Sequence, residues 1–431
     1  MSAILKENLQ NPNLDNLEQS ATLLINDKVR NMKAAGERVF NMGLGQSPFP
    51  VPQHVTDALK HHAHEKDYLS VKGLPLLREE VANFHRRNDE VEIRSDQVMI
   101  GPGSKELLFL LQLCFHGEIL VPSPCWVSYI PQAKILNKKI SLVHTKFEDR
   151  WRITPAKLQE VCDHLVDKDR SAILILNYPG NPDGMTYTSE ELKEISEVAR
   201  QNNLIILSDE IYGQLNHNAE HYSIAKYYPE GTIVSGGISK WCGAGGWRVG
   251  TFTFPDDLKW LKEAMAVVAS ETYTSVSAPV QFAAIQAFKG GSLMEEYLMH
   301  CRRILATLGE KTYRQLHDTG LNVHPPEGGF YHFVDFSPFK EQLAKKGIHD
   351  STQLCETLLN ETGVAALPGS AFARKKNELT VRFAYVDFDG AKAITGSQLH
   401  PLHQPLPEEF TTKYCISPVK ATEAIRDWVL K

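Results

Sequence analysis

The sequence predicts an α/β protein with a mostly parallel central sheet flanked by helices, plus a smaller α+β domain. Two continuous apolar runs, residues 171–176 and 204–207, are bounded by polar turns, which is typical of strands buried on both faces of a parallel sheet. Residues 189–201, between these runs, have the pattern of an amphipathic helix with Thr188 or Ser189 as its N-cap. This alternation places ligand chemistry at the carboxyl ends of the strands.

The remaining elements follow in chain order. An amphipathic helix is expected over residues 17–38, and a Gly/Pro-rich connection follows at 41–53. Further strands of the sheet are expected at 98–100, 119–121, 232–235 and 249–254, with a helix from about Lys105. A long helix over 293–317 then leads to shorter strands around 329–335 and 379–384.

The length of 431 residues suits more than one domain. We expect residues 1–50 to be an N-terminal segment packing with the small domain, 51–305 to form the large domain, and 306–431 to form the small C-terminal domain. The tail includes a polar and proline-rich loop at about 395–410. That loop either covers the site or packs on the surface.

Composition excludes several classes of protein. The formal charge of −6, from 46 basic and 52 acidic residues, argues against nucleic-acid binding, which usually needs a concentrated basic face. No apolar stretch is long enough to span a membrane, and no secretory signal is recognised at the start. Seven dispersed cysteines without a CxxC pair indicate reduced thiols in the cytoplasm. No metal site is expected, since His61, His62 and His64 lack a matching set of ligands.

Residues 235–250, SGGISKWCGAGGWRVG, contain a lysine just past a predicted strand and an arginine eight residues later. A lysine that acts as a nucleophile needs a crowded, partly desolvated position that lowers its pKa. Lys240 in this Gly-rich turn fits that need. The alternative is a surface lysine in an ordinary glycine loop.

Two more polar segments follow predicted strands. Asn181 lies in the turn NYPGNPDG after the first apolar run, and Asp209 and Tyr212 follow the second. These side chains would therefore meet Lys240 at one edge of the sheet, where a buried carboxylate needs a positive partner. The alternatives are that Asp209 is a helix N-cap and that the Asn181 segment is a simple turn.

These segments, in this order, resemble the class I/II aminotransferases of fold type I, which depend on pyridoxal 5′-phosphate. The resemblance runs from about Gly43 to Asp389 and includes a late arginine in the segment TVRFAY. It implies transfer of an amino group between an amino acid and a 2-oxo acid. A lyase, cyclase or decarboxylase on the same fold is the alternative. The family also implies a cytoplasmic homodimer with shared active sites.

The resemblance implies three catalytic residues. Lys240 would form a Schiff base with the cofactor and move the substrate proton. Asp209 would pair with the pyridinium nitrogen. Tyr212, with Asn181, would hydrogen-bond the 3′-oxygen of the ring.

The resemblance also implies residues that bind cofactor and substrate. Arg248 would hold the phosphate at the N-terminus of the helix that follows GPGSK, and Trp126 would stack on the ring. Arg382 would bind the substrate α-carboxylate through a bidentate fork, with Gly45 and Asn181 beside it. Tyr68 would reach the phosphate of the neighbouring subunit. The remaining cofactor-binding candidates are Gly103, Ser104, Lys105 and Ser239.

The sequence departs from the family pattern at several points. Gly237 stands where the family usually has Ser or Thr near the phosphate, so Ser235 or Ser239 would have to compensate. Asp183 is an additional acid without an assigned role. Lys105 either reads a distal carboxylate or is a charge on the phosphate side. The substrate side-chain pocket is expected from loops near residues 46–50, Tyr129 and residues 273–277, and the family implies cis prolines at positions such as Pro124 and Pro182.

Overall fold

A computed structural model describes residues 11–15, 17, 19–165 and 172–431 of the chain. Its centre is a seven-stranded sheet with the order β2-β8-β7-β6-β5-β3-β4. The strands are β2 (Val98–Gly101), β3 (Ile119–Ser123), β4 (Ile140–His144), β5 (Ile173–Asn177), β6 (Ile205–Asp209), β7 (Thr232–Gly237) and β8 (Gly250–Thr253). All neighbouring pairs from β7 to β4 are parallel, and only β8 runs antiparallel to its two neighbours. The predicted mostly parallel sheet is confirmed.

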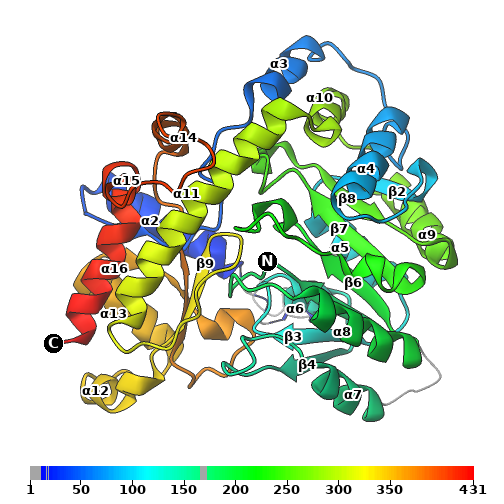
Figure 1. The fold of residues 1–431 in the computed structure, drawn as a ribbon. Coiled ribbons are helices and arrows are strands. Elements are labelled where there is room, and N and C mark those ends of the chain that lie inside the picture. Colours follow the sequence, from blue (N-terminus) through cyan, green and yellow to red (C-terminus); the bar gives the residue numbers. More distant parts are fainter. Residues whose placement is uncertain (1–10, 16, 18, 166–171) are drawn as a thin grey trace, which may run out of the picture.

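Helices cover both faces of this sheet (Figure 1). Strand β5 shows why its sequence is apolar throughout. Ile173 and Ile175 pack into a cluster with α5 (Ser104–Cys114) and α9 (Lys259–Ser270). Leu174 and Leu176 belong to a second cluster, formed with α7 (Pro155–Asp163) and α8 (Ser189–Gln201). Successive side chains of a strand point to opposite faces, so a strand between two helical layers is apolar at every position.

Strand β4 was not predicted, and its position explains the omission. It lies at the edge of the sheet beside β3. Only Val143 of its five residues is buried, while Leu142 and His144 are exposed. The strand therefore lacks the continuous apolar run that identifies the central strands.

Smaller sheets lie outside the central one. A three-stranded antiparallel sheet has the order β11-β12-β9, and β1 pairs in parallel with β10. The bounds of these strands are β1 (Phe40–Asn41), β9 (Tyr331–Asp335), β10 (Val364–Ala365), β11 (Leu367–Pro368) and β12 (Thr380–Ala384). Helix α2 (Ala21–Ala34) contributes Val29 to a cluster with Leu359 and Ala365, so the two ends of the chain pack together.

The remaining helices include one long element, α11 (Ser292–His317), which matches the predicted helix and is labelled in Figure 1. The others are α3 (Gln53–His61), α4 (Pro75–Asn88), α6 (Tyr129–Ile135), α10 (Ala278–Lys289), α12 (Lys340–Lys345), α13 (Ser351–Thr362), α14 (Gly390–Gln398), α15 (Glu409–Tyr414) and α16 (Ile416–Val429). Within the described ranges, no helix is both long and apolar enough to cross a membrane.

The loop after α14 packs on α11. Arg303 of α11 donates hydrogen bonds to the carbonyl oxygens of Ser397, Pro401 and Leu402. These bonds hold the loop against α11.

Candidate active site

A cavity of about 550 Å³ lies at the carboxyl ends of β5, β6 and β7. Ten of the predicted site residues line it: Gly45, Ser104, Lys105, Trp126, Asn181, Asp209, Tyr212, Ser239, Lys240 and Arg248. The cavity forms here because the parallel strands all present their polar continuations at the same edge.

Lys240 lies in the turn after β7, half-buried, and its Nζ donates to the carbonyl oxygen of Gly45 at 2.8 Å. Burial, followed by the charges of Arg382 and Arg248, lowers the pKa of Lys240 to about 8, although Asp209 opposes the shift. A substantial fraction of this amine is therefore neutral near physiological pH, as a nucleophilic lysine requires.

Asp209 is the last residue of β6 and is 4% exposed. Its carboxylate accepts hydrogen bonds from the Tyr129 hydroxyl at 2.6 Å and from Ser235 Oγ at 3.4 Å. Burial raises the pKa of Asp209 to about 6, although the bond from Tyr129 opposes the shift. No lysine, arginine or histidine of the described chain forms an ion pair with it, so this buried acid suits a cationic group on a bound ligand.

Two residues expected elsewhere therefore serve Asp209. Tyr129 was expected in the substrate side-chain pocket, but it is 1% exposed and lies behind the carboxylate. Ser235, considered as a phosphate ligand, also bonds Asp209. Asn177 was missed: its side chain donates to the backbone oxygen of Asp209 at 2.9 Å and accepts from the backbone N–H of Asn181 at 2.8 Å.

Tyr212 follows β6 and is buried. Its hydroxyl lies 2.7 Å from the hydroxyl of Tyr331, at the start of β9. Tyr331 was not among the predicted site residues, because one aromatic residue in a strand is ordinarily a core residue. Nothing in the neighbouring sequence, GGFYHF, marks it as a site residue.

Arg382 lies in β12 and is 1% exposed. It donates to Asn181 Oδ1 at 3.1 Å and to the carbonyl oxygen of Gly43, while its Nε has no partner. No carboxylate of the described residues pairs with this buried guanidinium. A buried arginine that bonds only neutral groups suits a carboxylate ligand. Arg382 does not itself line the cavity but lies directly behind Asn181.

Gly103, Ser104 and Arg248 meet at the start of α5. Ser104 is the first residue of that helix, where backbone N–H groups have no intrahelical acceptors and favour an anion. A Cβ atom at Gly103 would lie 1.9 Å from Nη2 of Arg248. Arg248 has a φ of +58° and donates to the carbonyl oxygen of Gly245 at 2.9 Å. This corner combines an arginine with the amides of a helix N-terminus, so it suits an anion.

A family model described as aminotransferase class I and II matches residues 37–388. The chain belongs to this family. An aspartate aminotransferase of Bacillus sp. (strain YM-2) is 33% identical over 391 residues, which cover 88% of this chain and 95% of that enzyme. An asparagine–oxo-acid transaminase of Streptococcus mutans is 29% identical over 380 residues, covering 86% and 92% of the two chains. The structure of the Thermus thermophilus aspartate aminotransferase with maleate has a TM-score of 0.82 at 26% identity, covering 97% of this chain and 99% of that one.

The protein is thus an aminotransferase, which moves an amino group between an amino acid and a 2-oxo acid. The predicted fold and reaction are both confirmed. The cis proline expected at Ser123–Pro124 is present, whereas the second cis bond precedes Pro179 rather than Pro182.

The departure at Gly237 has a steric cause in this aminotransferase. Gly237 has a φ of +148°, and a Cβ atom there would lie 2.6 Å from the carbonyl oxygen of Val249. Only glycine adopts this backbone conformation without strain. A Ser or Thr would not fit, which leaves Ser239 as the nearby serine that lines the cavity.

Asp183 forms a buried ion pair with Arg152, and their side chains are 2% and 7% exposed. Arg152 also donates to the carbonyl oxygen of Asn177 at 3.1 Å. The additional acid in the Asn181 loop therefore neutralises a buried arginine beneath that loop. It does not face the cavity.

Tyr68 differs from the buried site residues in its exposure to solvent. It is 89% exposed and does not line the cavity of its own chain. Its predicted contact with a neighbouring subunit stays a prediction.

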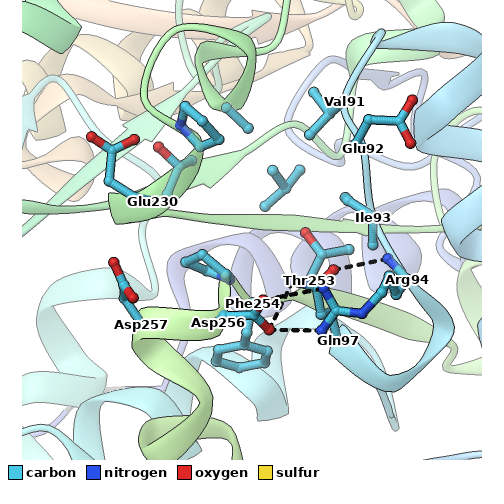
Figure 2. A pocket seen from close by; sticks show the side chains of 15 residues that line it. Val91, Glu92, Ile93, Arg94, Gln97, Glu230, Thr253, Phe254, Asp256 and Asp257 are labelled. Carbon is cyan, nitrogen blue, oxygen red and sulfur yellow. Dashed lines mark hydrogen bonds and ion pairs between the residues drawn. The ribbon is translucent and has the colours of Figure 1, made fainter.

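A second cavity, of about 320 Å³, lies at the opposite end of β7 (Figure 2). The acidic residues Glu92, Glu230, Asp256 and Asp257 line it, and Arg94 donates to Asp256 at 2.7 Å. None of the predicted site residues lies there.

Proposed function

We propose that this aminotransferase takes the amino group of a dicarboxylic amino acid and uses pyridoxal 5′-phosphate as its cofactor. The observation that carries the proposal is the charge of the site. Lys105, Lys240 and Arg248 line the cavity and Arg382 lies behind Asn181, whereas Asp209 is the only acid among the described residues that line it. Such an excess of cations suits several anionic groups, namely a phosphate and more than one carboxylate.

The residues present fit the cofactor at both of its ends. Ser104, the first amides of α5 and Arg248 would hold the phosphate, and the unpaired Asp209 would meet the ring nitrogen. Trp126, at the cavity wall, would stack on the ring. When bound, pyridoxal phosphate supplies an aldehyde that an amine attacks and a ring that accepts the electrons of the substrate α-carbon.

The chain itself supplies the binding and the proton transfer. The Lys240 amine, with its lowered pKa, is the nucleophile that holds the cofactor and the base that moves the α-proton. Tyr212 donates its hydroxyl hydrogen to the cofactor oxygen. Arg382 fixes the α-carboxylate, which orients the substrate over Lys240.

Arg248 is assigned to the phosphate and Arg382 to the α-carboxylate, while Lys240 is the nucleophile. Lys105 is therefore the remaining cation without an assigned anion. Its Nζ lies 5.1 Å from the centre of the Trp126 ring, and partial burial, then the charge of Arg248, lowers its pKa. We assign it to the distal carboxylate of the substrate. The relatives named for aspartate support this assignment.

The active enzyme is a cytoplasmic homodimer in this proposal. The exposed Tyr68 would reach the phosphate of the other subunit. This contact would account for the exposure of the tyrosine in the single chain. Seven unpaired cysteines in the described chain suit a reducing compartment. The division of the chain at residues 50 and 305 is also a proposal, and the second boundary falls within α11.

Donor panels on two variants test the substrate assignment. Lys105→Met should lower kcat/KM for aspartate and glutamate by roughly 10- to 100-fold, the usual loss for a hydrogen bond between charged groups, and leave alanine unchanged. Lys105→Arg is the control that keeps the charge. Equal losses for every donor, together with weaker cofactor binding, would assign Lys105 to the phosphate instead. The absence of any absorbance of bound pyridoxal phosphate would refute the cofactor proposal.

A further inference from the structure

Tyr331 stands between two groups to which the proposed function gives roles. Its hydroxyl is 2.7 Å from that of Tyr212, and the two rings meet edge to face at 5.6 Å and 80°. Both side chains are buried, at 0% and 2% exposure. A contact between two hydroxyls uses one hydrogen and leaves the other free for a further acceptor.

The same ring carries the guanidinium of Arg382. The arginine Cζ lies 4.8 Å from the ring centre of Tyr331. The register of the sheet produces this contact: Tyr331 lies opposite Ala384, and Arg382 lies opposite Phe333. Arg382 is thus a diagonal neighbour of Tyr331, within reach of a long side chain.

Tyr331 also packs against Gly45, the backbone position that accepts the hydrogen bond of Lys240. A Cβ atom at Gly45 would lie 2.1 Å from the Tyr331 hydroxyl, and the carbonyl oxygen of Gly45 accepts the bond from Lys240. One side chain therefore touches the residue assigned to the cofactor oxygen, the residue assigned to the carboxylate and the backbone partner of the lysine.

We propose that Tyr331 is a positioning residue. Its hydroxyl directs the Tyr212 hydrogen toward the cofactor, and its ring holds the guanidinium of Arg382 in place. For Tyr212 to donate to the cofactor oxygen, its own oxygen must accept from Tyr331. The Tyr331 hydroxyl therefore sets the direction of one hydrogen bond, while its ring stabilises the guanidinium through a cation–π contact. The inference rests on the proposed roles of Tyr212 and Arg382.

Two substitutions separate these parts. Tyr331→Phe removes only the hydroxyl, so the bond from Tyr212 to the cofactor oxygen weakens. That bond stabilises the deprotonated form of the bound cofactor, and the pH midpoint of its visible absorbance should rise, by less than the roughly one unit that losing the whole bond would cause. The dissociation constant of maleate, a non-reacting dicarboxylate, should stay within about twofold because the ring remains. Tyr331→Leu should shift the midpoint and also weaken maleate binding by roughly 2- to 30-fold.

Tyr385→Phe is the matched control. Tyr385 is buried near the same sheet, and its hydroxyl has no hydrogen-bond partner among the described residues, so both readouts should equal those of the unchanged enzyme. An unshifted midpoint in Tyr331→Phe, where Tyr212→Phe does shift it, would refute the inference and leave the proposed function intact. An equal shift in the control would also refute it. An unshifted midpoint in Tyr212→Phe would instead overturn the role of Tyr212 in the proposed function.

Discussion

The ion pair beneath the Asn181 loop makes a strong prediction about stability. Asp183 and Arg152 are both buried, so Asp183→Asn leaves the arginine charged in a dry interior. Asn can still accept the backbone N–H of Met185, as Asp183 Oδ1 does now at 2.8 Å, but its NH2 group then faces Arg152 where Asp183 Oδ2 accepts now. The variant should therefore fold, at a cost in free energy.

The cost follows from the burial of the pair. Removing one partner of a buried ion pair typically costs about 3–5 kcal/mol, because the remaining charge is uncompensated. For a chain of 431 residues, the usual unfolding entropy per residue converts 1 kcal/mol into about 1 °C. Asp183→Asn should therefore lower the Tm by roughly 3–5 °C, measured by calorimetry at a fixed cofactor concentration.

Two further variants test this reasoning. The double replacement Arg152→Met with Asp183→Asn removes both charges, keeps an acceptor for the Met185 N–H, and should recover part of the loss. Asp57→Asn breaks an exposed pair with Lys60 and should leave the Tm unchanged. If Asp183→Asn melted with the Asp57 control, or if the double variant were the least stable of all, the assignment of Asp183 as a buried counter-charge would be wrong.

Three other predictions concern the site. Capture of pyridoxal phosphate by the apoenzyme should accelerate as pH rises through about 8, where the Lys240 amine loses its proton. Arg382→Gln should move the midpoint of this pH dependence to higher pH, because a nearby positive charge is removed. An unmoved midpoint would argue against coupling between the two charges. Gly237→Ser should lower the Tm, whereas Gly246→Ser, where an added Cβ meets nothing within 4 Å, should leave the Tm unchanged; equal losses of Tm would contradict the steric account. Mixing inactive variants of Tyr68 and Lys240 should restore activity in hybrid dimers, and no recovery despite proven subunit exchange would exclude the contact across subunits.

Local patterns were sufficient for the central sheet and for much of the cavity. The uninterrupted apolar runs of β5 and β6 identify strands covered on both faces, and chain order then places Asp209 and Lys240 at one edge. Parallel strands joined by helices must end on the same side of a sheet. The edge strand β4 lacks such a run, so its local sequence resembles a loop.

Contacts between distant segments needed the tertiary structure. Tyr129 bonds Asp209 across 80 residues, and Tyr212 meets Tyr331 across 119. Nothing near Tyr331 in the chain distinguishes it from a core aromatic residue. Its role depends on the register between β9 and β12, which no short segment encodes.

The chain alone thus specified which elements form and which chemistry gathers at the sheet edge, because periodicity and turn residues act over a few neighbouring positions. The folded molecule decided which groups share the low-dielectric interior. Among the described residues no lysine, arginine or histidine forms an ion pair with Asp209, while Asp183 neutralises Arg152 and Gly237 has no room for a side chain. Burial and charge pairing are properties of packed surfaces from remote segments, and the free energies that set pKa values arise only there.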